Sequence, residues 1–248
     1  MTTDELVIGL IARLLKDAGT VAVGSSSPIP AAASLLAQAT SGGKTRALIF
    51  RNNISDPFPE SGSELYDRIG QGRIDVCFLS GGQIDGQANL NMVGVGEYPR
   101  TRVRFPGSHG TPFIYLMVPR VILYRDEHSR RVLVPKVDFI SAPGGSPDNV
   151  VRPGGPIALV TNRCLFEFDR AQPRFRLASV HPGHSVEEVV ENTGFAFDRP
   201  AQVPLTPAPT ADTLRLMRNV VAPMLAEVYP QFAQKVFGVA APLPSAHA

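Results

Sequence analysis

Histidine and cysteine side chains are the first candidates for chemistry, because they bind metals and exchange protons near neutral pH. His181 and His184 flank a Pro-Gly pair, but a zinc site needs further ligands nearby, and neither Cys77 nor Cys164 lies at a suitable spacing. Both cysteines lie inside apolar runs, which indicates buried free thiols in a reducing cytoplasm. The sequence therefore predicts no metal centre.

Glycine-rich motifs give no dinucleotide fingerprint. Residues 70–72 and 94–96 each contain a Gly-x-Gly pattern, but neither has the third glycine and the strand-to-helix context that seat a pyrophosphate. Turns are the simpler interpretation of both. A Ser-His-Asp arrangement cannot be assigned from residue order alone.

The composition excludes some classes of partner. The 248-residue chain has a formal net charge of +2, which is too small to indicate a nucleic acid or a membrane surface as partner. Arg100, Arg102 and Arg104 alternate like one face of a strand, either a solvated face or an anion-binding surface. No run reaches the ~18 apolar residues of a membrane span, and the N-terminus lacks a signal-peptide pattern. We therefore expect a cytoplasmic protein.

Helical and strand-like patterns alternate along the first part of the chain. Apolar residues have helical spacing at 6–15, 28–39 and 63–69, and strand-like runs occur at 20–23, 46–50 and 74–79. Later strands are expected at 121–124, 132–140, 157–168 and 175–180, and later helices at 186–191 and 210–228. This alternation predicts an α/β fold with a mainly parallel sheet flanked by helices. We expect one domain over residues 1–238 and a disordered tail at 239–248.

Several short segments occur in a fixed order along the chain. They lie within residues 74–91, 101–110, 136–144, 160–169 and 180–195. Each alone could be only a strand and a turn, but their order and spacing together resemble the β subunit of family I CoA transferases. Within this family the segments resemble glutaconate CoA-transferase, and the likeness covers roughly residues 5 to 220.

The resemblance implies a NagB/RpiA/CoA transferase-like fold and a homologous α subunit, in a heterodimer or heterotetramer with the active site between the subunits. It implies coenzyme A, as a thioester substrate, and transfer of CoA to a carboxylate through a glutamate that attacks the thioester and then carries CoA. Backbone amides of a glycine-rich loop stabilise the oxyanion. In this sequence the resemblance implies that Gly107, Ser108 and Gly110, together with Gly81 and Gly82, bind CoA.

The nucleophile position departs from the family pattern. The family's glutamate directly follows a buried strand, whereas here the strand at 46–50 continues into Arg51. An arginine stays protonated and cannot attack a thioester. Glu60 begins a literal Glu-Ser-Gly nine residues later, which is either the displaced motif or a polar turn with Ser61 as helix cap.

The glycine loop also departs from the family's Gly-Ser-Gly-Gly, because His109 replaces a glycine. His109 is either a catalytic proton-exchanging group or merely exposed. These changes are similar to those of the steroid ring-opening hydrolases that keep this fold. The sequence thus favours a CoA transferase β subunit, with a CoA-thioester hydrolase or retro-Claisen enzyme, or a non-catalytic scaffold subunit, as alternatives.

Overall fold

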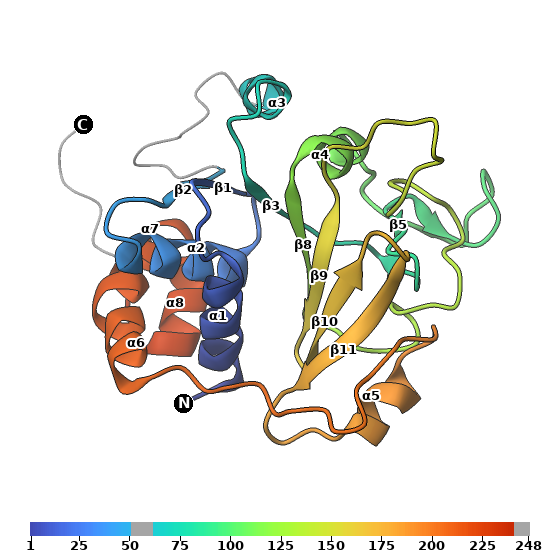
Figure 1. Cartoon of the computed structure of the whole chain (residues 1–248). Coiled ribbons are helices and arrows are strands. Elements are labelled where there is room, and N and C mark those ends of the chain that lie inside the picture. Colours follow the sequence, from blue (N-terminus) through green and yellow to red (C-terminus); the bar gives the residue numbers. More distant parts are fainter. Residues whose placement is uncertain (51–61, 241–248) are drawn as a thin grey trace. The chain divides into compact units, whose positions relative to one another are not determined.

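The computed structural model describes residues 1–50 and 62–240, and the chain divides into two compact units. One unit combines Met1–Leu65 with Pro207–Ala248, and the other is Tyr66–Thr206. Figure 1 shows the helices and strands of both. The expected single domain over residues 1–238 stays a prediction, and most of the expected tail, 239–248, lies outside the described residues.

The first unit packs helices around a short parallel ladder. β1 (Thr20–Val23) pairs with β2 (Arg46–Ile49), and Phe50 N–H extends the ladder by donating to Val23 O at 2.9 Å. Its helices are α1 (Thr3–Leu14), α2 (Pro28–Thr40), α6 (Ala211–Leu216), a π-helical turn (Met217–Val221), α7 (Ala222–Val228) and α8 (Pro230–Phe237). Helix α2 contacts α1, the π-helical turn and α7, so both ends of the chain contribute to one core (blue and orange-red in Figure 1).

An ion pair between α1 and the π-helical turn links the N-terminal and C-terminal parts of this unit. Thr2 caps α1 in a reciprocal capping box with Glu5, whose carboxylate is almost fully buried. That carboxylate also accepts two hydrogen bonds from Arg218, at 2.7 and 3.1 Å. Burial raises the pKa of Glu5, but the bonds from Arg218 and Thr2 outweigh it and leave this pKa below its ordinary value.

The second unit is built on a mixed sheet with strand order β11-β10-β9-β8-β3. β3 (Val76–Leu79), β8 (Arg120–Arg125) and β9 (Pro156–Thr161) run parallel, and β10 (Cys164–Asp169) and β11 (Arg174–Val180) add antiparallel strands. Helices α4 (Thr111–Met117) and α5 (Val186–Asn192) lie at opposite ends of these strands (Figure 1). The predicted α/β fold with a mainly parallel sheet is confirmed.

Two small ladders follow β3 before α4 begins. β4 (Gln83–Ile84) pairs with β5 (Leu90–Asn91), and β6 (Gly94–Val95) pairs with β7 (Val103–Arg104). Arg100, Arg102 and Arg104 around this second ladder are all exposed. Helix α3 (Gly62–Gly70) precedes β3 and carries Tyr66, the first residue of the second unit.

The prediction of a strand at 132–140 is wrong. Only Leu133 forms an isolated bridge, with Ile84, and the segment continues as a loop. Pro135 lacks an N–H to donate, and the next amides bond to side chains instead. Val137 N–H donates to the Asp85 carboxylate at 3.5 Å, and Asp138 N–H donates to Gln83 Oε1 at 3.0 Å. The apolar residues of this segment therefore pack without forming a ladder.

Candidate functional site

The glycine loop, residues 107–110, is a closed turn that leads into α4. Gly107 has φ +110°, a conformation that favours glycine, and its N–H donates to Met92 O at 3.1 Å. Thr111 N–H donates to Ser108 O at 2.8 Å, and Gly110 caps the helix with φ −82° and ψ 10°. The loop is thus fixed at both ends by backbone hydrogen bonds.

Three successive amides of this loop have no acceptor among the described residues. They are the N–H groups of Ser108, His109 and Gly110. The backbone φ angle is positive at Gly107 (+110°) and at His109 (+41°), and it is negative at Gly110 (−82°). Such turns direct neighbouring N–H groups into a concavity that suits an anion or a polarised carbonyl oxygen. The glycine loop can therefore stabilise an oxyanion.

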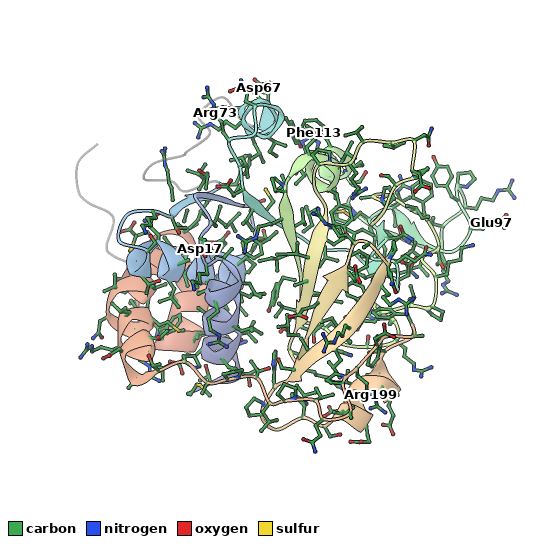
Figure 2. The ribbon with its side chains drawn as sticks, in the orientation of Figure 1. Asp17, Asp67, Arg73, Glu97, Phe113 and Arg199 are labelled. Carbon is green, nitrogen blue, oxygen red and sulfur yellow. The ribbon has the colours of Figure 1, made fainter. Side chains whose placement is uncertain are left out.

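Tyr66 of α3 packs directly on the glycine loop. A Cβ added to Gly110 would collide with both Cζ and Oη of Tyr66, so the tyrosine fills the space of the missing side chain. The His109 ring is exposed, with its centroid 5.8 Å from that of Tyr66, and Phe113 meets Tyr66 edge-on at 6.1 Å. Phe113 on α4 and Asp67 on α3 mark these two helices in Figure 2. Sequence reasoning missed Tyr66, which lies over forty residues before the loop.

Gly81 and Gly82 have structural reasons to be glycine. A Cβ on Gly82 would collide with the Phe105 ring, and one on Gly81 would lie 2.7 Å from Gln83 O. Gly82 N–H donates to Asn91 O at 2.9 Å and so extends the small β4–β5 ladder. The predicted contact of these glycines with CoA stays a prediction.

The polar residues at 83–91 form a buried network. Asn91 Nδ2 donates to Gln83 Oε1 and to Gly94 O, at 2.6 and 2.7 Å. Asp85 accepts the N–H groups of Gln87 and Asn89 at 3.0 Å, and Asn89 Oδ1 accepts Gly144 N–H at 3.1 Å. These side chains fix the loops next to the sheet. Their regular spacing in the sequence reflects this architecture.

Arg51 and Glu60 lie outside the described residues, so the structure places neither. Their roles, and the register that puts Arg51 at the nucleophile position, stay predictions. His109, Gly107, Ser108 and Gly110 do lie together in the loop described above.

A second polar cluster contains two buried histidines, of which sequence reasoning singled out only His181. Its Nδ1 lies 2.8 Å from Thr206 Oγ1, and its Nε2 lies 3.1 Å from Thr161 O. The ring nitrogens of His128 lie 2.8 Å from Thr161 Oγ1 and 2.9 Å from Thr193 Oγ1. Burial lowers the pKa of both histidines to about 4, with a further contribution at His128 from the nearby positive charge of Arg163.

These hydrogen bonds fix the tautomer of each ring. Thr161 O can only accept, so His181 Nε2 carries the proton and Nδ1 accepts the Thr206 hydroxyl. Thr193 donates to Val189 O at 2.7 Å, so His128 Nε2 donates to Thr193 and Nδ1 accepts the Thr161 hydroxyl. Because burial lowers their pKa values to about 4, both rings are neutral near pH 7, and each ring nitrogen has a hydrogen-bond partner.

The cysteines behave as the sequence predicted. Cys77 and Cys164 are free and buried, and burial raises the pKa of both thiols to about 12. Over residues 1–50 and 62–240, no three or more His, Cys, Asp or Glu side chains gather as a metal site would require. No helix in this same part of the chain combines the length and the apolarity needed to span a membrane.

Cavities of about 640 and 660 Å³ occur in the second and the first unit respectively. The first lies between the 85–89 turn and Phe195, and the second lies between α1, α2 and the 207–210 connector. Neither is lined by a described residue of the glycine loop, which therefore lies outside both hollows.

The family model for coenzyme A transferase matches residues 8–192. The B subunit of 3-oxoadipate CoA-transferase from Pseudomonas knackmussii is 32% identical over 218 residues, covering 86% of this chain and 81% of that protein. The B subunit of glutaconate CoA-transferase from Acidaminococcus fermentans is 31% identical, covering 65% of this chain and 62% of that protein. The chain belongs to the coenzyme A transferase family, as the sequence predicted.

Two further similarities concern chemistry other than transfer. The cholesterol ring-cleaving hydrolase IpdB subunit of Rhodococcus jostii is 28% identical over 164 residues, 64% of each chain. A solved structure of the decarboxylase AibA/AibB superposes with a TM-score of 0.74 at 25% identity, covering 96% of this chain and 99% of that one. The similar proteins thus have names that describe transferase, hydrolase and decarboxylase chemistry.

Proposed function

We propose that this chain is the B subunit of a two-component enzyme that acts on an acyl-CoA thioester, with the glycine loop binding the thioester carbonyl. The observation that carries the proposal is the set of three unpaired amides at Ser108, His109 and Gly110 among the described residues. In a coenzyme A transferase family chain, neighbouring loop amides without another partner suit the oxygen that becomes negative during acyl transfer.

The second component is an α subunit of the same family. Relatives whose names designate them as B subunits, and the two-component AibA/AibB, support this assignment. The position of the glycine loop outside the two cavities described above also supports it, because the remaining walls of a substrate site must then come from elsewhere. The free thiols favour a reducing compartment, the cytoplasm, for the assembled enzyme.

Transfer of CoA to a carboxylate acceptor is the first proposed reaction, with Glu60 as the candidate nucleophile and CoA as thioester substrate. Thioester hydrolysis or C–C cleavage is the second, favoured by Arg51, which follows β2 and Phe50 in the sequence, and by the likeness to a ring-cleaving hydrolase subunit. In that case Arg51 would hold an anionic group and a partner residue would supply the reactive acid or base.

The test uses the chain purified with its α subunit and a panel of acyl-CoA thioesters. A transferase forms a glutamyl-CoA thioester that hydroxylamine traps, and peptide mass spectrometry places the adduct. A hydrolase releases free CoA with no carboxylate acceptor present. An adduct on Glu60 would establish transfer and overturn Arg51 as the occupant of the nucleophile position.

Single substitutions separate catalysis from a scaffold role. Glu60→Ala, His109→Ala and Arg51→Ala should each lower turnover if this chain carries catalytic groups. Unchanged turnover in all three variants, with intact assembly, would instead assign catalysis to the α subunit.

A further inference from the structure

Tyr66 has an unusual position among the tyrosines of this chain. Its side chain is half-buried against the glycine loop, with Oη at the place where a Gly110 side chain would begin. Among the described residues, no donor or acceptor pairs with this hydroxyl. This half-buried hydroxyl lies next to Gly110, whose amide also has no partner among the described residues, so it can hydrogen-bond to a ligand that enters the loop.

The other tyrosines make this contrast clear. The Tyr115 hydroxyl donates to Ala88 O at 2.8 Å, and the Tyr229 hydroxyl accepts Ser27 N–H at 3.3 Å. The Tyr124 hydroxyl lies 3.5 Å from the Asp126 carboxylate, and Tyr98 is 55% exposed to water. Tyr66 alone combines partial burial, an unpaired hydroxyl and contact with the glycine loop in the described part of the chain.

Packing holds the Tyr66 ring in this place. The ring contacts Phe113 edge-on on one helix and His109 in the loop, so three groups limit its rotation. The absence of a side chain at Gly110 leaves room for the hydroxyl, and any larger residue would displace it. A donor held by packing has little additional ordering cost when a substrate oxygen arrives.

We infer that Tyr66 is a further catalytic residue, whose hydroxyl donates a hydrogen bond to the thioester carbonyl oxygen bound by the glycine loop. This inference rests on the proposed function. When a nucleophile attacks the carbonyl carbon, the C=O π pair moves onto oxygen, and the bond from Tyr66 strengthens as that oxygen gains charge. Tyr66 keeps its proton throughout, so no proton acceptor is needed.

This role predicts an effect on turnover more than on substrate binding. Loss of one oxyanion donor in other enzymes lowers kcat by ~10²–10³-fold, and the remaining amides would retain part of the stabilisation. We expect Tyr66→Phe to lower kcat by about 10- to 100-fold with KM within about threefold. The phenyl ring preserves the contacts with Gly110, His109 and Phe113.

The experiment compares wild type, Tyr66→Phe and the control Tyr98→Phe, each assembled with the α subunit. Isotope-edited infrared spectroscopy measures the C=O stretch of bound [1-¹³C]acetyl-CoA, and calorimetry measures its binding. We expect wild type and Tyr98→Phe to shift the stretch to lower frequency, and Tyr66→Phe to bind with a smaller shift. This readout responds to polarisation of the carbonyl and requires no turnover.

The outcomes distinguish the two proposals. Equal frequency shifts and equal kcat in wild type and Tyr66→Phe would overturn the role of Tyr66 and leave thioester binding intact. Failure of the wild-type complex to bind acetyl-CoA or any other thioester of the panel would overturn the proposed function itself, and with it the substrate for Tyr66. If Tyr66→Leu lowers kcat but Tyr66→Phe does not, packing alone explains the residue.

Discussion

The buried histidines predict that the folded chain loses stability when the pH falls below neutrality. His128 and His181 have pKa values lowered to about 4 in the folded protein, against 6.5 for an ordinary histidine. Between these values the unfolded chain binds more protons than the folded chain, so the free energy of unfolding decreases as the pH falls. The stabilisation is complete above pH ~6.5 and is progressively lost toward pH ~4.

The magnitude follows from the two pKa values. On going from pH 7.5 to pH 5, each histidine should reduce the free energy of unfolding by about 2 kcal/mol, and both together by about 4 kcal/mol. Carboxyl groups with lowered pKa values contribute little in this window. Glu127, whose pKa is lowered to about 2 chiefly by its bond to Arg131, loses its stabilisation only as the pH falls below the ordinary value of 4.5. A loss of ~4 kcal/mol is a large share of a typical domain stability of ~5–15 kcal/mol.

The assay is urea denaturation at pH 7.5, 6 and 5, followed by far-ultraviolet circular dichroism because the chain has no tryptophan. His128→Asn and His181→Asn should each lower stability at pH 7.5, because a paired ring is lost, but each should remove about half of the pH-dependent change. The double variant should show almost none. Equal stability of the wild-type chain at pH 7.5 and 5 would refute neutral, paired rings in the cluster.

Three further predictions follow from packing, ion pairing and burial. Gly110→Ala should lower kcat/KM by at least ~10-fold and lower the free energy of unfolding by about 1–3 kcal/mol, because the added Cβ would collide with Tyr66. The control Gly145→Ala, where a Cβ has space, should match wild type in enzyme assays and thermal melts. Arg218→Met should lower the midpoint of urea denaturation, since it leaves the buried Glu5 carboxylate with only Thr2 N–H and the N-terminal ammonium as partners. An unchanged midpoint would contradict the importance of this pair. Cys77 and Cys164 should react with a thiol reagent at pH 8 only after unfolding, and stoichiometric labelling of the native protein within minutes would be inconsistent with their burial and raised pKa.

Local patterns predicted the elements of the fold well where periodicity and burial agree. The apolar runs at β1, β2, β3, β8 and β11 form strands, and the helical spacing at α1 and α2 forms helices. The single strand expected at 157–168 is instead two antiparallel strands, β9 and β10. The prediction for 132–140 was wrong although the segment has the apolar residues typical of a strand. Pro135 has no N–H, and two of the following amides donate to the side chains of Asp85 and Gln83, so they cannot pair with a neighbouring strand. Those acceptors are distant in sequence, so no local pattern could indicate them.

The candidate site was predictable only in part. The glycine loop could be singled out because its residues are contiguous, and Gly107, Ser108, His109 and Gly110 do lie in one turn, but their binding of a thioester carbonyl stays a prediction. Tyr66 could not be found, since only the folded chain brings α3 against the loop. His128 was overlooked for the same reason, because its two partners come from separate elements.

Gly82 and Gly110 limit which substitutions this family can accept at two further positions. Each leaves a space that an aromatic ring occupies, Phe105 in one case and Tyr66 in the other. A single methyl group at either glycine would meet a ring that other residues already hold, so the two members of each pair are expected to change together. Homologues that replace one of these glycines should carry a smaller or differently placed residue opposite, and such paired substitutions would link distant positions in an alignment.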